Sequence, residues 1–197
     1  MEMNEFSNDN RGGTGTLTVI AGPMFSGKSA RLLEIVKGFA VHEKIVAVFT
    51  HAIDTRRGIG DISTHDGRSI PAIPVTQARD ILPFAEVAEA VAVDEAQFFG
   101  AELMNVVDAL LDRGVDVVVC GLSVTFDGRP FSPIPELMAV TERVEKLTAD
   151  CSVCGAPASF HQPASNQDLG DPLEIEERQV GGAEAYEARC RRHATRQ

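Results

Sequence analysis

The segment at residues 22–29 carries the clearest chemical signal in the chain. It reads Gly-Pro-Met-Phe-Ser-Gly-Lys-Ser and fits the pattern G-x-x-x-x-G-K-S. The glycines allow a tight turn whose backbone N–H groups face phosphate oxygens, and the helix that begins there offers its positive end to the same anion. Lys28 then meets the β- and γ-phosphates of a nucleotide, and the Ser29 hydroxyl binds Mg²⁺. The expected phosphate-binding residues are Gly22, Pro23, Met24, Phe25, Ser26, Gly27, Lys28 and Ser29.

The surroundings of this segment argue against a chance match in a glycine-containing turn. An apolar run at residues 17–21 precedes it, and a helical pattern follows from about Lys28 to Phe39. The motif requires this order of strand, loop and helix. We therefore interpret the segment as a phosphate-binding loop.

Two carboxylates, Asp94 and Glu95, follow another apolar run at residues 90–93. In P-loop proteins an acid at the end of a neighbouring strand holds Mg²⁺, and Asp94 suits that role because it ends the run. Successive strand residues face opposite ways, so Glu95 is expected to point elsewhere. There it can act as general base for an acceptor hydroxyl, or orient a water as in an ATPase. The residue types leave both roles open, and a solvated strand end is the plain alternative.

Four residues near the C-terminus have the spacing of metal ligands. Cys151 and Cys154 form a C-x-x-C pair, and Cys190 and His193 form a C-x-x-H pair. Zn²⁺ takes three thiolates and one imidazole in tetrahedral geometry, and two-residue spacings let one turn present both ligands of a pair. Four protein ligands leave no open position, which predicts a structural zinc. The alternatives are a redox pair for the first two cysteines and a solvated side chain for His193.

A sheet of parallel strands is needed to bring these groups together. Four short runs are apolar at nearly every position, at residues 17–21, 45–49, 90–93 and 115–120. This is expected of strands that are buried on both faces of a parallel sheet. Further helical patterns occur at about residues 76–85 and 101–112. Strands that alternate with helices predict an α/β fold with a mainly parallel sheet.

The composition divides the chain into three parts. Residues 1–15 are polar and are expected to be a disordered N-terminal segment. Residues 16–149 are expected to form the P-loop nucleotide-binding domain. From about residue 150, cysteines, glycines, prolines and polar residues replace the apolar runs. We therefore place a zinc-binding domain at residues 150–197.

The charge of the chain restricts its partners. It has 18 basic and 29 acidic residues and a net charge of −11. Such a chain repels a phosphate backbone, which argues against DNA or RNA as its main ligand, whereas a nucleotide needs only a local cradle. No apolar run approaches the roughly 20 residues that span a bilayer, and the N-terminus lacks the features of a signal peptide. We expect a cytoplasmic protein with no membrane partner, whose thiols stay reduced.

Several segments in order resemble one enzyme family. Besides residues 22–29, the matching segments are Asp54-Thr55-Arg56, Thr64-His65-Asp66, and residues 94–99, 121–126, 146–151 and 180–183. Over roughly residues 16–193 the chain resembles the thymidine kinases related to the human cytosolic enzyme. The resemblance implies a P-loop NTPase-like (RecA-like) sheet flanked by helices, with a small C-terminal zinc-binding domain. A lasso-like loop of that domain, here about residues 161–186, closes the nucleoside site.

The resemblance also implies a reaction and its participants. The γ-phosphate of ATP passes to the 5′-hydroxyl of thymidine, and of deoxyuridine as well, with Mg²⁺ and a structural Zn²⁺, in nucleotide salvage for DNA synthesis. Glu95 matches the catalytic base, Asp94 the second magnesium contact, and Arg56 an arginine near the reacting phosphates. The residues implied to contact the nucleoside are Met24, Phe98, Leu122, Phe126, Val180, Gly181 and Tyr186. The family further implies a homotetramer and inhibition by thymidine triphosphate.

Three features depart from the family pattern. Ser123 stands where the family usually has aspartate, and residues 160–163, Phe-His-Gln-Pro, stand where it shows Thr-x-Arg. An acidic tract at residues 168–177 precedes Val180. We expect an altered contact near the pocket, the loss of one phosphate-side arginine, and a change in how the lasso-like loop becomes ordered.

Two rival functions have distinct expectations. A P-loop ATPase with a zinc interaction module would use Glu95 to activate water and would hydrolyse ATP without a nucleoside. A zinc ribbon that binds nucleic acid would carry clustered Lys and Arg, yet residues 155–177 contain neither. The second rival is therefore the weaker one.

Overall fold

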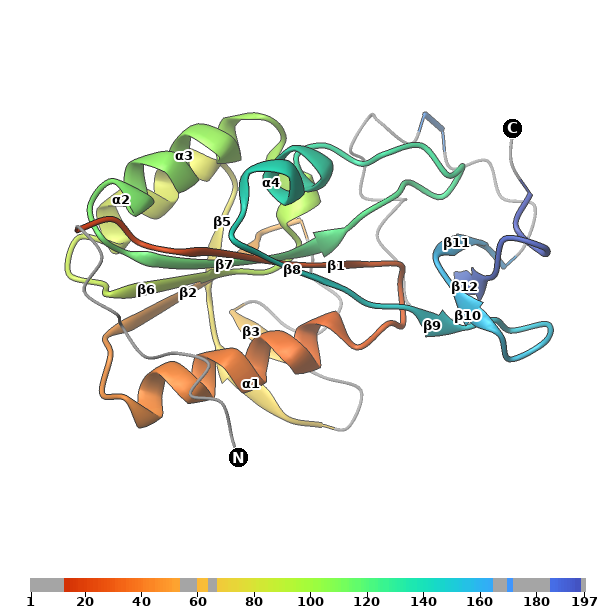
Figure 1. The fold of residues 1–197 in the computed structure, drawn as a ribbon, viewed down its shortest axis with the longest axis horizontal. Helices are drawn as coiled ribbons and strands as arrows, with labels where there is room; N and C mark the ends of the chain where they lie inside the picture. The colour runs from red at the N-terminus through yellow and green to blue at the C-terminus, as the bar shows by residue number, and fades with distance from the viewer. Residues whose placement is uncertain (1–12, 54–59, 64–66, 165–169, 172–184, 196–197) are drawn as a thin grey trace.

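Six strands form the central sheet of the computed structural model, which describes residues 13–53, 60–63, 67–164, 170–171 and 185–195 (Figure 1). Their order is β5 (Ile73–Val75), β2 (Val46–His51), β6 (Ala90–Val93), β7 (Asp116–Leu122), β1 (Leu17–Gly22) and β8 (Arg143–Lys146). Neighbouring strands of this sheet are all parallel. The four strands predicted from apolar runs occupy its centre, where burial on both faces requires apolar side chains throughout.

Helices cover both faces of the sheet. α1 (Lys28–Val41) packs on one face, and α2 (Ile81–Phe84), α3 (Glu102–Leu111) and α4 (Ile134–Val140) lie on the other (Figure 1). The α1 side chains Leu32, Leu33 and Phe39 belong to one hydrophobic core, and the α3 side chains Leu103 and Val107 belong to the second. This arrangement confirms the predicted α/β fold.

Some elements differ from the sequence predictions. The helix predicted at about residues 76–85 is a 3₁₀ turn, η1 (Ala78–Asp80), followed by the single turn of α2. It begins only at Ala78 because Gln77 has an extended backbone with φ −134° and ψ 144°. β5 and β8 were not predicted. β5 contains a proline and β8 is mostly charged, so neither forms an apolar run, and both lie at the edges of the sheet.

The parallel arrangement gathers the predicted functional segments at one end of the sheet. β1 ends at Gly22, β6 ends directly before Asp94, and β7 ends at Leu122. Because these strands are parallel, their carboxyl ends lie at the same end of the sheet, where open α/β sheets bind ligands. The 3₁₀ helix η2 (Ala96–Phe99) follows β6 there.

Three small antiparallel pairs complete the described structure. β3 (Asp61–Ser63) pairs with β4 (Ser69–Pro71), β9 (Ala149–Asp150) with β10 (Pro157–Ala158), and β11 (Phe160–Pro163) with β12 (Tyr186–Arg189). The C-terminal strands enclose a separate small core of Ala149, Cys151, Ala158, Ala188 and Cys190. Ala149 begins this core and adjoins the predicted domain boundary, which stays a prediction.

Two further predictions concern the N-terminal segment and membrane-spanning helices. Apart from residues 13–15, the segment expected to be disordered lies outside the described residues. Among the residues that are described, no helix has the length and apolar character needed to cross a membrane.

Candidate active site

The phosphate-binding loop turns through two residues with positive φ. Gly27 directly precedes α1 with φ 81°, and Phe25 adopts φ 66° although it carries a side chain. Left-handed residues of this kind form backbone concavities whose N–H groups bind anions. A non-glycine residue costs about 1–2 kcal/mol in this conformation. Strain at Phe25 therefore supports a functional role for the loop.

Close packing requires glycine at position 22. A Cβ atom there would lie 2.6 Å from Ser26 Oγ and 2.8 Å from the Leu147 carbonyl oxygen. The Ser26 hydroxyl and the Lys28 ammonium both donate hydrogen bonds to the Pro23 carbonyl oxygen, at 2.9 and 2.8 Å. The Lys28 charge therefore lies over the turn where the motif places the phosphates.

Ser29 and Asp94 bring two kinds of magnesium ligand together. Ser29 Oγ donates a hydrogen bond of 3.1 Å to Asp94 Oδ2, which joins the start of α1 to the end of β6. Asp94 is buried, and its Oδ1 accepts a hydrogen bond of 2.9 Å from the Glu95 N–H. Mg²⁺ prefers hydroxyl, carboxylate and water oxygens, so this donor set fits the ion.

Glu95 has a different partner from Asp94. Gln97 Nε2 donates a hydrogen bond of 2.6 Å to Glu95 Oε2, and Gln97 Oε1 accepts one of 3.0 Å from the Leu122 N–H. The alternation of strand residues, from which we predicted that Glu95 points away from Asp94, does not apply here. β6 ends at Val93, and Glu95 has a left-handed backbone with φ 53°. The buried Gln97 amide thus ties the Glu95 carboxylate to the end of β7.

A pocket lies between the carboxyl end of the central strands and the two C-terminal strands β11 and β12. Its lining residues are Met24, Phe98, Leu122, Thr125, Phe126, Phe131, His161 and Tyr186. All five described members of the expected nucleoside-binding set are among them. Leu122 belongs both to this lining and to the hydrogen-bond chain that reaches Glu95. A mostly apolar pocket with a few polar groups is typical of small-molecule sites.

Three of the lining residues were not predicted. Thr125 and Phe131 come together because the chain turns back at residues 125–128, and the Phe131 N–H donates a hydrogen bond of 3.2 Å to the Ser123 carbonyl oxygen. The Asp-Gly pair at the tip is a turn signal that could have revealed this fold-back. The third residue, His161, has no comparable local signal, because its position depends on the pairing of β11 with β12.

Some expected site residues belong to parts of the chain that the structure does not describe. Arg56, Val180, Gly181 and most of the lasso-like loop lie outside the described residues. Ser123, the position where the family usually has aspartate, is buried, and its Oγ has no hydrogen-bond partner in the described part of the chain.

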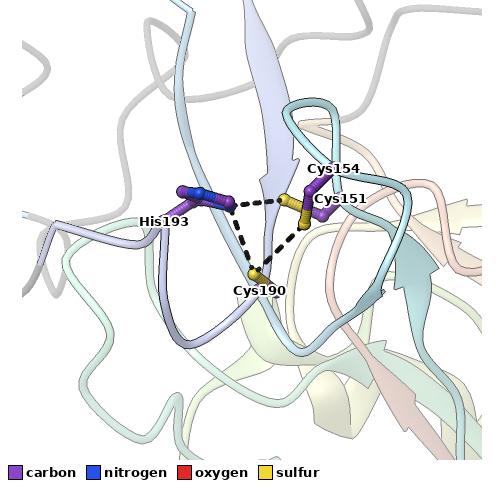
Figure 2. A group of neighbouring side chains, drawn as sticks. All are labelled: Cys151, Cys154, Cys190 and His193. Carbon is purple, nitrogen blue, oxygen red and sulfur yellow. Dashed lines mark hydrogen bonds between the residues drawn. The ribbon is translucent and has the colours of Figure 1, made fainter.

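The four expected metal ligands lie together near the C-terminus (Figure 2). Cys151 and Cys154 lie on the turn after β9, and Cys190 and His193 lie on the turn after β12. The sulfur atoms of Cys154 and Cys190 are 3.8 Å apart. His193 Nδ1 is 3.6 Å from Cys151 Sγ and 3.4 Å from Cys190 Sγ.

These separations match the edges of a tetrahedron around zinc. Zn–S bonds of about 2.3 Å and Zn–N bonds of about 2.0 Å put two sulfurs about 3.8 Å apart, and a sulfur and a nitrogen about 3.5 Å apart. Hydrogen bonds from the backbone of Cys190, and further ones from Val153, Cys154 and the His193 ring, lower the pKa of Cys151 to about 5. This favours the thiolate that zinc binds. The cluster therefore fits a structural Zn²⁺.

The sheet, the loop and the acids that follow β6 define a P-loop nucleotide-binding protein of the α/β class. The family profile described as "Thymidine kinase" matches residues 15–194, from just before β1 to just beyond the last cluster residue. The chain therefore belongs to the thymidine kinase family, which makes it a nucleoside kinase and confirms the resemblance seen in its motifs.

Proposed function

We propose that the protein transfers the γ-phosphate of ATP to the 5′-hydroxyl of thymidine, and of deoxyuridine as well, in nucleotide salvage. The main observation behind this proposal is that the pocket lies close to the Glu95 carboxylate. Leu122 lines it, and the Leu122 N–H is joined through the Gln97 amide to the Glu95 carboxylate. A carboxylate held beside an apolar pocket suits a base that receives a proton from a bound alcohol.

The donor side uses the loop residues for charge and position. Lys28 neutralises charge on the transferred phosphoryl group, and the loop amides hold the remaining phosphate oxygens. Ser29 and Asp94 would hold Mg²⁺, which when bound would offset the negative charge of the phosphates. The protein thus contributes mainly alignment of the donor with the acceptor hydroxyl, together with electrostatic stabilisation.

The acceptor side uses Glu95 and the pocket walls. Glu95 accepts the proton of the 5′-hydroxyl as the oxygen attacks the γ-phosphorus and the bond from that phosphorus to the bridging oxygen breaks, so that ADP leaves. Apolar walls such as Met24 and Phe98 sense the thymine methyl, but a group of that size gives only about 1–3 kcal/mol of discrimination. Deoxyuridine is therefore expected to be a slower substrate. Family membership further supports a homotetramer in the cytoplasm that thymidine triphosphate inhibits.

A product assay tests the reaction. Purified protein with Mg·ATP should form ADP and thymidine monophosphate in equal amounts, and only when thymidine is present. Both products can be followed by chromatography over time. Equal ADP formation with and without nucleoside would show that Glu95 activates water, and the ATPase alternative would replace the kinase.

Gln97 is expected to set the basicity of Glu95. In Gln97→Glu the new side chain can still accept from the Leu122 N–H, but it places a second carboxyl group where Nε2 donated to Glu95. A like charge raises the pKa of its neighbour, so kcat at neutral pH should fall about 10- to 100-fold and recover partly at higher pH. The measurement is kcat against pH.

A matched control makes this result specific. Gln77→Glu introduces the same charge at an exposed position and should leave the pH profile unchanged. If Gln97→Glu also keeps the wild-type profile, Gln97 does not act on Glu95.

A further inference from the structure

One histidine lines the nucleoside pocket with a nitrogen that lacks a partner. His161 lies on β11 and is only 3% exposed. Its Nδ1 atom is buried and has no hydrogen-bond partner within the described residues. An unpaired buried polar atom is costly and uncommon in folded proteins. Its position on a pocket wall indicates that a bound ligand supplies the missing partner.

Strand pairing directs the His161 ring toward the pocket. β11 and β12 are antiparallel, with His161 opposite Ala188. The ring meets Tyr186 edge-on, with centroids 5.7 Å apart and planes at 68°. Tyr186 lines the same pocket, so the two rings form one wall of the space that we assign to the nucleoside.

The rest of the lining offers a ligand few polar atoms. Its apolar members are Met24, Phe98, Leu122, Phe126 and Phe131. The Thr125 hydroxyl is already bonded to the Asp127 carboxylate and to the Arg129 backbone. His161 Nδ1 is thus a buried lining atom whose hydrogen-bonding capacity is still unused.

The His161 imidazole is neutral at physiological pH. Burial lowers its pKa to about 3, and the positive charge of Lys28 contributes in the same direction. A neutral imidazole can use Nδ1 as a donor or as an acceptor, according to its tautomer. His161 therefore offers the pocket a neutral hydrogen-bonding group rather than a positive charge.

We propose that His161 is a specificity-determining residue of the acceptor site and that its Nδ1 forms a hydrogen bond with a polar ring atom of the bound pyrimidine nucleoside. This inference rests on the proposed function, because it takes the acceptor nucleoside as the occupant of the pocket. A site built to pair a buried polar group rejects ligands that lack the matching atom. The substrate class is therefore a pyrimidine nucleoside with a hydrogen-bonding group on the base edge that faces β11.

Substitution of His161 tests the hydrogen bond. His161→Phe keeps an aromatic ring and removes both nitrogens, so the Kd and KM for thymidine should rise about tenfold while kcat and the KM for ATP change little. His161→Asn returns a polar atom close to the position of Nδ1 and should recover most of the loss. His42→Asn, at an exposed histidine, is the control and should behave as the wild type.

Comparison of two nucleosides separates hydrogen bonding from packing. Thymidine and deoxyuridine differ by one methyl group and share all their polar ring atoms. Loss of a hydrogen bond to a shared atom raises both KM values by the same factor. If His161→Phe instead changes their ratio, and His161→Asn does not restore affinity, the contact is with the methyl group and the proposal is overturned.

Calorimetry measures nucleoside binding without catalysis, so it tests the role of His161 separately from the proposed kinase reaction. If thymidine binds and its Kd depends on His161 as described, but no thymidine monophosphate forms, the kinase reaction fails and the role of His161 stands. If thymidine is phosphorylated and His161→Phe has the wild-type Kd, only the role of His161 is overturned. A lower melting temperature with an unchanged Kd also overturns it, because the residue is then purely structural. A wild-type protein that binds no pyrimidine nucleoside overturns both.

Discussion

Replacing Glu95 with glutamine should lower kcat about 10²- to 10⁴-fold while the Kd for Mg·ATP stays close to that of the wild type. An amide cannot accept the proton of the 5′-hydroxyl, whereas the phosphate-binding loop and the Ser29–Asp94 pair are untouched by the change. The substitution keeps the size of the side chain, and the Gln97 amide can still donate to its oxygen. The loss should therefore appear in turnover rather than in donor binding.

The measurement is single-turnover formation of thymidine monophosphate, with ATP binding followed separately. Glu95→Asp withdraws the carboxylate by one methylene and should recover part of the rate. Glu136→Gln makes the same chemical change at an exposed position on α4 and serves as the control. Unchanged turnover in Glu95→Gln would remove this residue from the role of base.

Removal of zinc should abolish thymidine binding while ATP binding persists. Structural zinc contributes about 10–16 kcal/mol of apparent free energy in small zinc domains, far more than the few buried apolar residues of the C-terminal core can replace. The cluster joins the turn after β9 to the turn after β12. β12 contains Tyr186 and pairs with β11, which contains His161. Loss of the metal should therefore unfold these strands and remove one wall of the pocket. The phosphate-binding loop lies on the sheet and should remain folded.

Chelation and substitution test this expectation together. Cys151→Ser and protein treated with a chelator should both lack zinc by elemental analysis, and both should lose thymidine binding in calorimetry. Cys120→Ala is the control, because Cys120 is buried in the sheet and is not part of the cluster. Wild-type affinity for thymidine in metal-free protein would show that the cluster does not support the pocket.

The features predicted from the sequence are those that depend on short segments. The phosphate-binding loop spans eight residues, and each pair of metal ligands spans four, so one turn is enough to place the groups. The four central strands are predictable because burial on both faces leaves an apolar residue at nearly every position. For the same reason the polar edge strands, such as β8, leave no signal.

The features that were missed depend on backbone geometry or on contacts between distant segments. The direction of Glu95 follows from its left-handed backbone, which no alternation rule predicts. His161 enters the pocket because β11 pairs with a strand about 25 positions further along the chain. The hydrogen bonds of Gln97 require β6 and β7 to be neighbours, which the order of the segments in the sequence does not reveal.

The loop at residues 22–29 contacts both the pocket and the small core of the C-terminal strands. Met24 lines the pocket, the adjacent Phe25 packs against the small core of the C-terminal strands, and Lys28 lies four positions beyond Met24. A bulky nucleoside analogue that displaces Met24 would therefore disturb the residues that hold the phosphates. Because such coupling is reciprocal, the donor nucleotide in turn influences which analogues are tolerated. Phosphorylation of an analogue would then depend on the concentration of ATP as well as on the fit of the analogue.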